Sequence, residues 1–286
     1  MALSLHICFK LNTVIYILEW QILVTNIYWF EAENISCFKN EYKVVKDLNL
    51  KLKYNENVIL IGPNGSGKSS LLELINRNIY PVIKEDSIFK IFNKERINIW
   101  ELRKKISTVN DDIRTRINEK LKVNDLIISG LYGKYCNITD KSERDVSLAE
   151  NLINKLSIKK LSQKYFSHLS EGEKQIALIA RALIKKPEIL MLDEPIANLD
   201  LKSKFIVIDQ INELTKLNTN IICISHDISM VTEIYNRVIM FKNGVIIADG
   251  TQSETINSKN LSNLFDINID VIKQKGSWQI YRNSKL

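Results

Sequence analysis

The sequence has few residues of the kinds that mark fibrous, disulfide-linked or metal-binding chains. Its 286 residues include 9 glycines, 4 prolines, 4 cysteines and 3 histidines. So little glycine and proline excludes a fibrous chain and argues against disorder. The cysteines, Cys8, Cys37, Cys136 and Cys223, lie far apart and form no CxxC pair. A zinc or redox site is therefore unsupported, and a reducing compartment fits best.

An uninterrupted apolar run long enough to cross a membrane is also missing. The longest candidate, residues 11–30, contains Glu19 near its centre. A spanning helix needs about 20 mostly apolar residues, and a carboxylate inside it is costly. The basic start and small-residue cleavage site of a signal peptide are not clear either. We interpret residues 1–28 as an N-terminal extension, accessory or non-native, rather than as a membrane anchor.

Long blocks of one charge are absent, although the net charge is +7 and the isoelectric point is near 9.0. A basic balance can indicate nucleic acid, an anionic membrane surface or a phosphorylated ligand. The lysines are scattered, and the densest basic stretch, residues 155–164, is interrupted by apolar residues. We therefore attribute the charge to overall composition and expect no nucleic-acid partner. Hydrophobic residues, at 45%, suffice for a substantial core.

The apolar pattern predicts strands alternating with helices. Period-two alternation and short apolar runs predict strands at 30–38, 43–53, 58–61, 87–92, 106–109, 189–192, 220–225, 237–241 and 245–249. Residues 112–168 instead show helical spacing and predict a helical subdomain inserted into the sheet domain. The tail, residues 251–286, is polar with short amphipathic pieces. This order predicts an α/β fold with a largely parallel sheet.

The strongest motif is GPNGSGKS at residues 62–69, between a predicted strand and a predicted helix. Small residues let successive backbone N–H groups cradle phosphate oxygens, and the following helix directs its positive end at the same anion. Lys68 is expected to reach the β- and γ-phosphates of ATP, and Ser69 to ligate Mg²⁺. The residues assigned to ATP here are Gly62, Pro63, Asn64, Gly65, Ser66, Gly67, Lys68, Ser69 and Ser70.

Two further motifs follow buried strands. Residues 189–195 read ILMLDEP, which delivers two carboxylates to the carboxyl edge of the sheet, where ligands bind in such folds. Asp193 is placed to hold Mg²⁺, and Glu194 to polarise the attacking water as general base. His226 closes another apolar strand and could contact the γ-phosphate and orient the water.

A fourth motif, LSEGEKQ at residues 169–175, opens a predicted helix. Ser170 is a natural N-cap, and Glu173 three residues later completes a capping box. Taken alone, this motif indicates only a helix start. A helix start is also an anion site, because its backbone N–H groups point outward.

In this order the four motifs resemble those of the nucleotide-binding domain of the ABC ATPase family, over roughly residues 29–250. Residues 62–69 match its Walker A loop, 190–194 its Walker B strand and 169–173 its signature LSGGQ. His226 matches its switch histidine, and Ala197-Asn198-Leu199-Asp200 matches its D-loop. Phe38, 24 residues before Gly62, matches the aromatic residue that stacks on adenine.

The resemblance implies a P-loop NTPase fold of the RecA-like type, with N-terminal antiparallel strands, and ATP and Mg²⁺ as ligands. Two such domains pair head to tail, so that Ser170, Gly172 and Glu173 face the ATP bound by a partner. The partner would be a second copy or a paralogous ATPase subunit. The pair would drive a separately encoded membrane permease from a cytoplasmic, peripheral position on the inner face of a membrane. Residues 251–286 would form a C-terminal tail.

The sequence departs from the family pattern in two places. The signature reads LSEGE, with Glu171 in place of the first glycine and Glu173 in place of the glutamine, and we expect the Glu171 side chain to point to solvent. The family also places a glutamine after the strand at 106–109, where it contacts Mg²⁺ and senses the membrane partner. Here the segment contains Asp111, Asp112 and Arg114 instead, and which of them replaces the glutamine stays open.

Three alternatives compete with a transport ATPase. The first is a soluble ABC ATPase, as in iron–sulfur assembly, which the loop resembles slightly. The second is a nucleic-acid-acting ABC protein. Such proteins carry tandem domains or long coiled-coil insertions, and the 102-residue spacing from Lys68 to Ser170 is too short for one. The third, an ATP-binding regulator without hydrolysis, is opposed by the intact Glu194 and His226.

Overall fold

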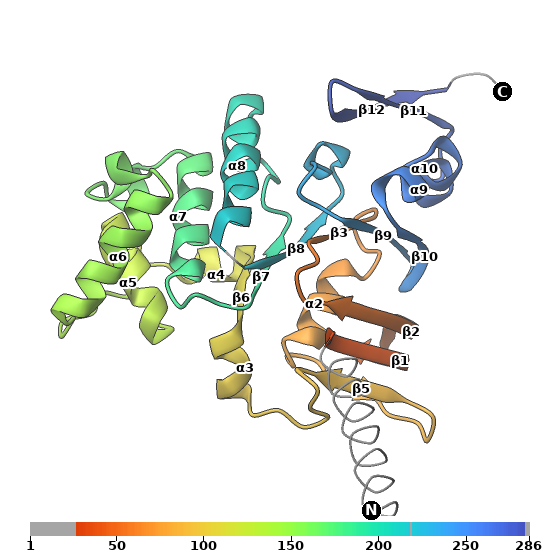
Figure 1. Ribbon diagram of the computed structural model, residues 1–286, viewed down its shortest axis with the longest axis horizontal. Coiled ribbons are helices and arrows are strands. Elements are labelled where there is room, and N and C mark those ends of the chain that lie inside the picture. Colours follow the sequence, from red (N-terminus) through yellow and green to blue (C-terminus); the bar gives the residue numbers. More distant parts are fainter. Residues whose placement is uncertain (1–26, 218, 284–286) are drawn as a thin grey trace, which may run out of the picture.

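The computed structural model describes residues 27–217 and 219–283. Two sheets and a group of helices make up most of this part, and a C-terminal unit lies beside them (Figure 1). The interpretation of the N-terminal extension concerns residues that lie almost entirely outside the described ones, and it stays a prediction. No helix among the described residues is long and apolar enough to cross a membrane.

The central sheet carries the site. Its six strands lie in the order β10-β9-β3-β8-β7-β6, and all neighbours are parallel except β9 and β10. All residues of β3 and β8 are buried, as expected for strands covered on both faces. The strands are β3 (Val58–Ile61), β6 (Ile106–Val109), β7 (Ile189–Asp193), β8 (Asn220–Ser225), β9 (Arg237–Lys242) and β10 (Val245–Gly250).

A second, antiparallel sheet precedes it in the chain. Strand β1 pairs with β2, β4 and β5, and its inner face shares one hydrophobic core with helix α2 and one face of the central sheet. Trp29 and Phe30 are fully buried there. The elements are β1 (Tyr28–Lys39), β2 (Tyr42–Lys53), α2 (Lys68–Ile75), β4 (Pro81–Val82) and β5 (Ile88–Ile91). The predicted α/β fold with N-terminal antiparallel strands is thus confirmed.

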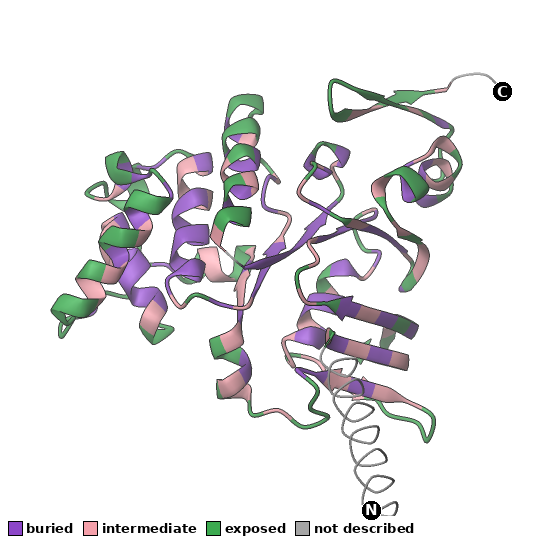
Figure 2. Cartoon of the chain, in the orientation of Figure 1, coloured by how far each residue is buried: buried purple, intermediate pink, exposed green. Residues whose placement is uncertain are grey.

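Helices fill the chain between β6 and β7. Helix α7 packs against α5 and is buried along most of its length (Figure 2). It approaches α5 so closely that a Cβ on Gly130 would lie 2.3 Å from the carbonyl oxygen of Arg181. The helices are α4 (Asp111–Arg116), α5 (Val123–Tyr132), α6 (Glu143–Lys155), η1 (Lys159–Leu161), η2 (Phe166–His168) and α7 (Glu171–Leu183).

The remaining elements flank the sheets. Helix α3 (Ile99–Lys105) precedes β6, α8 (Leu201–Glu213) and η3 (Leu214–Leu217) follow β7, and η4 (Ile228–Met230) follows β8. The tail forms α9 (Gln252–Thr255), α10 (Ser258–Phe265) and the hairpin β11 (Ile269–Gln274) and β12 (Ser277–Arg282). Sequence patterning did not predict this hairpin, because most of its residues are exposed and leave no alternating apolar signal.

Candidate active site

The phosphate loop, residues 62–69, turns from β3 into α2 in a conformation that favours glycine. Gly65 and Gly67 have φ angles of 77° and 100°. A Cβ on Gly67 would lie 2.5 Å from the carbonyl oxygen of Val44, so strand β2 closes against the loop. The buried hydroxyl of Ser66 has no hydrogen-bond partner among the described residues. A phosphate oxygen held in this turn would supply such a partner.

Lys68 opens α2 and is only 5% exposed. Its ammonium group donates hydrogen bonds to the carbonyl oxygens of Gly62, at 2.8 Å, and Pro63, at 2.9 Å. It also lies 3.8 Å from the carboxylate of Glu194. Burial lowers the pKa of Lys68, and the charges of Glu194 and Asp193 oppose that shift. The loop therefore holds a buried cation that suits a polyanion.

The two acids at the end of β7 lie beside the loop. Ser69 donates a hydrogen bond from its hydroxyl to Asp193 at 3.1 Å, joining α2 to β7. Burial raises the pKa of Asp193, and this hydrogen bond acts in the opposite direction. A hydroxyl and a carboxylate in contact are suitable oxygen ligands for Mg²⁺. No group of three or more metal-binding side chains occurs among the described residues. Mg²⁺ commonly needs only one or two protein carboxylates, with phosphates and water as its other ligands.

Glu194 and His226 join the ends of two neighbouring strands. His226 Nδ1 lies 2.8 Å from Glu194 Oε2, and the backbone N–H of Glu194 donates to the carbonyl oxygen of Ile224 at 2.9 Å. The φ of Glu194 is +50°, in the left-handed region that non-glycine residues rarely adopt. Backbone strain of this kind clusters at functional sites. The structure thus brings Lys68, Glu194 and His226 into one contact chain.

The predicted signature residues lie at the start of α7. The Ser170 hydroxyl accepts a hydrogen bond from the backbone N–H of Glu173 at 3.2 Å, and Glu173 accepts one from the Ser170 backbone N–H at 2.9 Å. Glu173 also pairs with Lys164 at 2.8 Å. The predicted capping box is therefore present. In residues 27–217 and 219–283, no hydrogen bond or ion pair joins residues 170–173 to the phosphate loop.

Asp200, from the predicted D-loop, caps helix α8. It accepts hydrogen bonds from the backbone N–H of Ser203 at 3.0 Å and from its hydroxyl at 2.6 Å, which lower the pKa of Asp200. A Cβ on Gly172 would lie 2.9 Å from Cβ of the same serine. Helices α7 and α8 therefore meet where Gly172 leaves room.

Comparison with known proteins identifies the family. A sequence model of the family described as ABC transporter matches residues 45–197. This chain belongs to the ABC transporter family. It is 32% identical over 243 residues to the ABC transporter ATP-binding protein YmeB of Lactococcus lactis, a match that covers 84% of this chain and 93% of YmeB. This membership confirms the predicted family, ATP as ligand, and ATP hydrolysis coupled to transport. The non-transport alternatives are not favoured.

Solved structures agree with this ABC assignment. The chain superposes on cbiO1 from Clostridium perfringens, part of the transporter complex cbiONQ, with a TM-score of 0.69 at 25% identity, covering 83% of this chain and 94% of that one. It also matches a dimeric ATP-binding cassette bound to ADP and phosphate, with a TM-score of 0.61 at 25% identity. That match covers 78% of this chain and 98% of the cassette.

In this ABC subunit, the segment that lacks the expected glutamine forms α4, capped by Asn110, which accepts from the Ile113 backbone N–H at 3.0 Å. The three candidates for replacing the glutamine have different surroundings. Asp112 pairs with Arg116, and Arg114 pairs with Glu171 from the signature. Asp111 lies close enough to Asp193 for its charge to contribute to the raised pKa of that carboxyl group.

The prediction that Glu171 points to solvent left out the ion pairs that its side chain forms. Its side chain is 44% exposed, but it forms ion pairs with Arg114 and, at 3.0 Å, with Lys174. Lys174 lies three residues after Glu171 in the same helix, a spacing at which opposite charges attract each other. This contact could therefore have been predicted from the sequence. Arg114 lies 57 residues earlier in the chain, and no local pattern relates it to Glu171.

Phe38 lies near the end of β1 and is 47% exposed, so its ring is available for stacking. It pairs in register with Lys43 of β2, next to Val44, whose carbonyl oxygen closes against Gly67. The aromatic residue predicted to contact adenine is thus on the strand pair that borders the phosphate loop.

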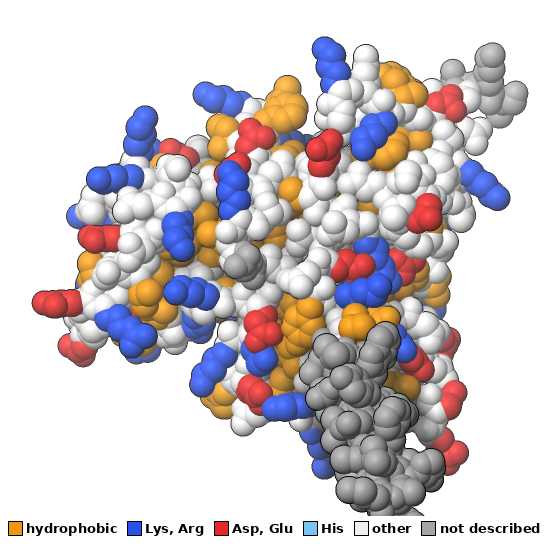
Figure 3. Space-filling model, in the orientation of Figure 1, with side chains coloured by type: hydrophobic (Ala, Val, Ile, Leu, Met, Phe, Trp, Pro, Cys, Tyr) orange, Lys and Arg blue, Asp and Glu red, His pale blue; other side chains and the backbone are white. Residues whose placement is uncertain are grey.

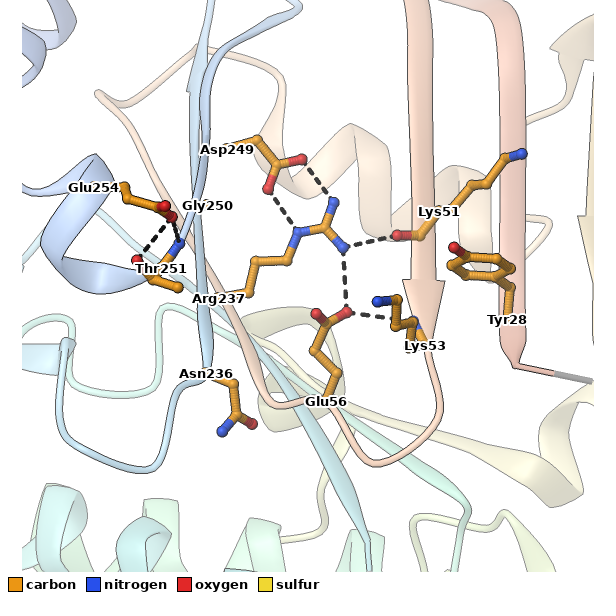
Figure 4. A pocket seen from close by; sticks show the side chains of 10 residues that line it. All are labelled: Tyr28, Lys51, Lys53, Glu56, Asn236, Arg237, Asp249, Gly250, Thr251 and Glu254. Atoms are coloured by element: carbon orange, nitrogen blue, oxygen red, sulfur yellow. Dashed lines mark hydrogen bonds and ion pairs between the residues drawn. The ribbon is translucent and has the colours of Figure 1, made fainter. Parts of the chain in front are cut away.

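A separate cavity of about 440 Å³ lies elsewhere, between β1, β2 and the β9–β10 hairpin (Figure 4). Arg237 crosses it with two hydrogen bonds to Asp249, both at 2.6 Å, and contacts Glu56 at 3.2 Å. Arg237 pairs in register with Val58, the first residue of β3, whereas the phosphate loop follows the last. The cavity therefore lies near the amino ends of the parallel strands, whereas the phosphate loop follows their carboxyl ends. The charged side chains at its centre pair with one another.

Proposed function

We propose that the chain hydrolyses MgATP in a head-to-tail pair of cassettes, each phosphate loop facing the signature helix of its partner. One observation carries this proposal. Lys68, Glu194 and His226 form one contact chain, while the start of α7 makes no hydrogen bond or ion pair with these residues in the described part of the chain. A second cassette would complete the site. The dimeric, nucleotide-bound cassette among similar structures supports this arrangement.

The residues at the loop fit nucleotide and metal. The Ser66 hydroxyl and the amides beside Gly65 and Gly67 would bind phosphate oxygens, and Lys68 would neutralise them. Phe38 would stack on the adenine. Ser69 and Asp193 would hold Mg²⁺, with Asp111 as the replacement for the missing glutamine. The metal would neutralise charge that develops on the phosphates.

Glu194 would accept the proton of the attacking water. Its Oε2 is held by His226, which leaves Oε1 on the Lys68 side of the site. His226 would orient the water and contact the γ-phosphate, since its side chain is 44% exposed at the strand end. Ser170 and Gly172 would contact the γ-phosphate bound by the partner cassette, and Asp200 would lie at the junction of the two.

Residues 29–250 would form the ATPase domain, with a helical subdomain at about 112–168 and a tail from 251. We further propose that the dimer drives a separately encoded permease and binds peripherally to the inner face of a membrane. Lys and Arg side chains lie interspersed with Asp and Glu on the face drawn in Figure 3, in keeping with a protein rather than a nucleic-acid partner. Capture of only soluble proteins or RNA from solubilised membranes would contradict the permease proposal.

The hydrolytic assignment has a direct test. Glu194→Gln should retain ATP binding and lower the turnover number by at least about a hundredfold, because general-base catalysis contributes about 10²–10⁴-fold. Steady-state phosphate release, together with equilibrium ATP binding, measures both effects. Glu188→Gln is a suitable control, since this carboxylate pairs with Lys105 at the start of β7, away from the loop. Unchanged turnover in Glu194→Gln would remove Glu194 from the mechanism.

A further inference from the structure

The two departures from the family pattern meet in space. Glu171 replaces a glycine in the signature, and Arg114 lies in the segment that lacks the glutamine. One carboxylate oxygen of Glu171 pairs with Arg114, and the other pairs with Lys174 at 3.0 Å. Each oxygen thus faces its own cation, one from a different helix and one from the same helix.

Glu171 lies at a position where a negative charge is electrostatically unfavourable. It lies between Ser170 and Gly172, the two residues proposed to face the γ-phosphate of a partner cassette. Like charges separated by several ångströms repel each other, more strongly at a closed interface than in open water. Unless its charge is neutralised, this carboxylate would repel the phosphates of a nucleotide and weaken their binding at the start of α7.

Arg114 is placed to supply that compensation. It belongs to α4, which follows β6 directly, and β6 pairs with β7, the strand that ends at Asp193. Asn110 caps α4 and fixes its start. The guanidinium group therefore extends from the edge of the catalytic sheet to the signature helix of the same chain. Its side chain is 31% exposed, so neighbouring residues partly cover it.

We propose that Arg114 is a positioning residue of the ATP site. It neutralises Glu171 and holds it aside, so that the start of α7 stays competent to receive the phosphates of a partner cassette. The inference rests on the proposed head-to-tail function. The proposed role of Arg114 depends on the carboxylate of Glu171. Arg114 should therefore have no such role when Glu171 is replaced by glycine.

The test uses full-length chain carrying Glu194→Gln as the parent, so that ATP is not consumed. Sedimentation velocity measures the MgATP concentration that gives half-maximal dimer. Arg114→Ala should raise this concentration about threefold to tenfold at low salt, and less at high salt, because salt screens partly exposed charges. Arg114→Lys keeps the charge and should largely restore the parent value.

Two comparisons isolate the mechanism. In a Glu171→Gly background, Arg114→Ala should change nothing, since no carboxylate is left to neutralise. Arg116→Ala is the matched control, because Arg116 lies in the same helix and pairs with Asp112 instead. The inference is overturned if Arg114→Ala still raises the half-maximal MgATP concentration in the Glu171→Gly background. It is also overturned if Arg116→Ala raises that concentration as much as Arg114→Ala does. A parent that fails to dimerise with MgATP contradicts the proposed function itself.

Discussion

Asp193 shows how a single side chain reports on the state of the site. Burial raises the pKa of this carboxyl group, with smaller contributions from Glu194 and Asp111. A folded pKa above the unfolded value means that ionisation disfavours the folded state. The penalty is fully present above the folded pKa and disappears as the pH falls below about 3.8, the value of the unfolded group. Bound Mg²⁺ would remove it by pairing with the charge.

Asp193→Asn should therefore raise the free energy of unfolding of the nucleotide-free chain at neutral pH, while abolishing MgATP hydrolysis. Urea denaturation at pH 7 and at pH 3.5 measures the effect, and the difference from wild type should shrink at the lower pH. Asp200→Asn is the contrasting control, since hydrogen bonds from Ser203 lower the pKa of Asp200, and the ionised form there stabilises the fold. A less stable Asp193→Asn chain at pH 7 would contradict this account.

At the residue scale, the sequence indicated where the phosphate loop and the two carboxylates lie, because each of them directly follows a strand with a clear apolar pattern. The Ser69–Asp193 and His226–Glu194 contacts follow from the parallel strand order, which places those strand ends at one edge. The Arg114–Glu171 ion pair could not be predicted. It depends on how the helices between β6 and β7 pack against one another.

At the level of elements, two helices begin with a serine capping box. Ser142 opens α6 and Ser170 opens α7, each with a capping box. Only the second lies in the signature. Substitutions at the two caps can therefore distinguish an effect on helix stability from an effect on the proposed contact with a partner nucleotide.

Ser170→Asp should abolish ATP hydrolysis with little loss of stability. Aspartate caps helices about as well as serine, but here it would place a negative charge against the partner's phosphates. Ser142→Asp should change neither property, because that helix start is outside the signature. Thermal unfolding and phosphate release, measured on both variants, give the comparison. Normal hydrolysis by Ser170→Asp would exclude this serine from the phosphate contact.

Elements with strong periodicity were predicted well, and those without it were not. The buried strands of the central sheet match their apolar runs to within a residue or two. The hairpin β11–β12 was missed. Its support is a tertiary contact, in which the Trp278 indole N–H donates to Gln252 at 3.1 Å, and Gln252 in turn donates to the carbonyl oxygens of Thr232 and Tyr235.

For the whole molecule, the order of the motifs predicted the family, because that order reflects one sheet topology with one helical insertion. We propose that one chain supplies two different halves of a site. In this arrangement the phosphate loop and its carboxylates would form one half, at the carboxyl ends of the central strands. The start of α7 would form the other, and neither half would be sufficient without the partner cassette.

Mixing two inactive variants tests this claim most directly. Lys68→Ala inactivates the phosphate loop and leaves the signature helix intact. Ser170→Asp inactivates the signature helix and leaves the phosphate loop intact. A mixed dimer contains one site built from two intact halves, so combining the purified variants should restore measurable MgATP hydrolysis that neither shows alone. Ser142→Asp mixed with Lys68→Ala is the positive control, and it should exceed the complementing mixture because Ser142→Asp homodimers contain two intact sites. A mixture of Lys68→Ala and Ser170→Asp no more active than its separate components would contradict a site shared between two copies of this chain.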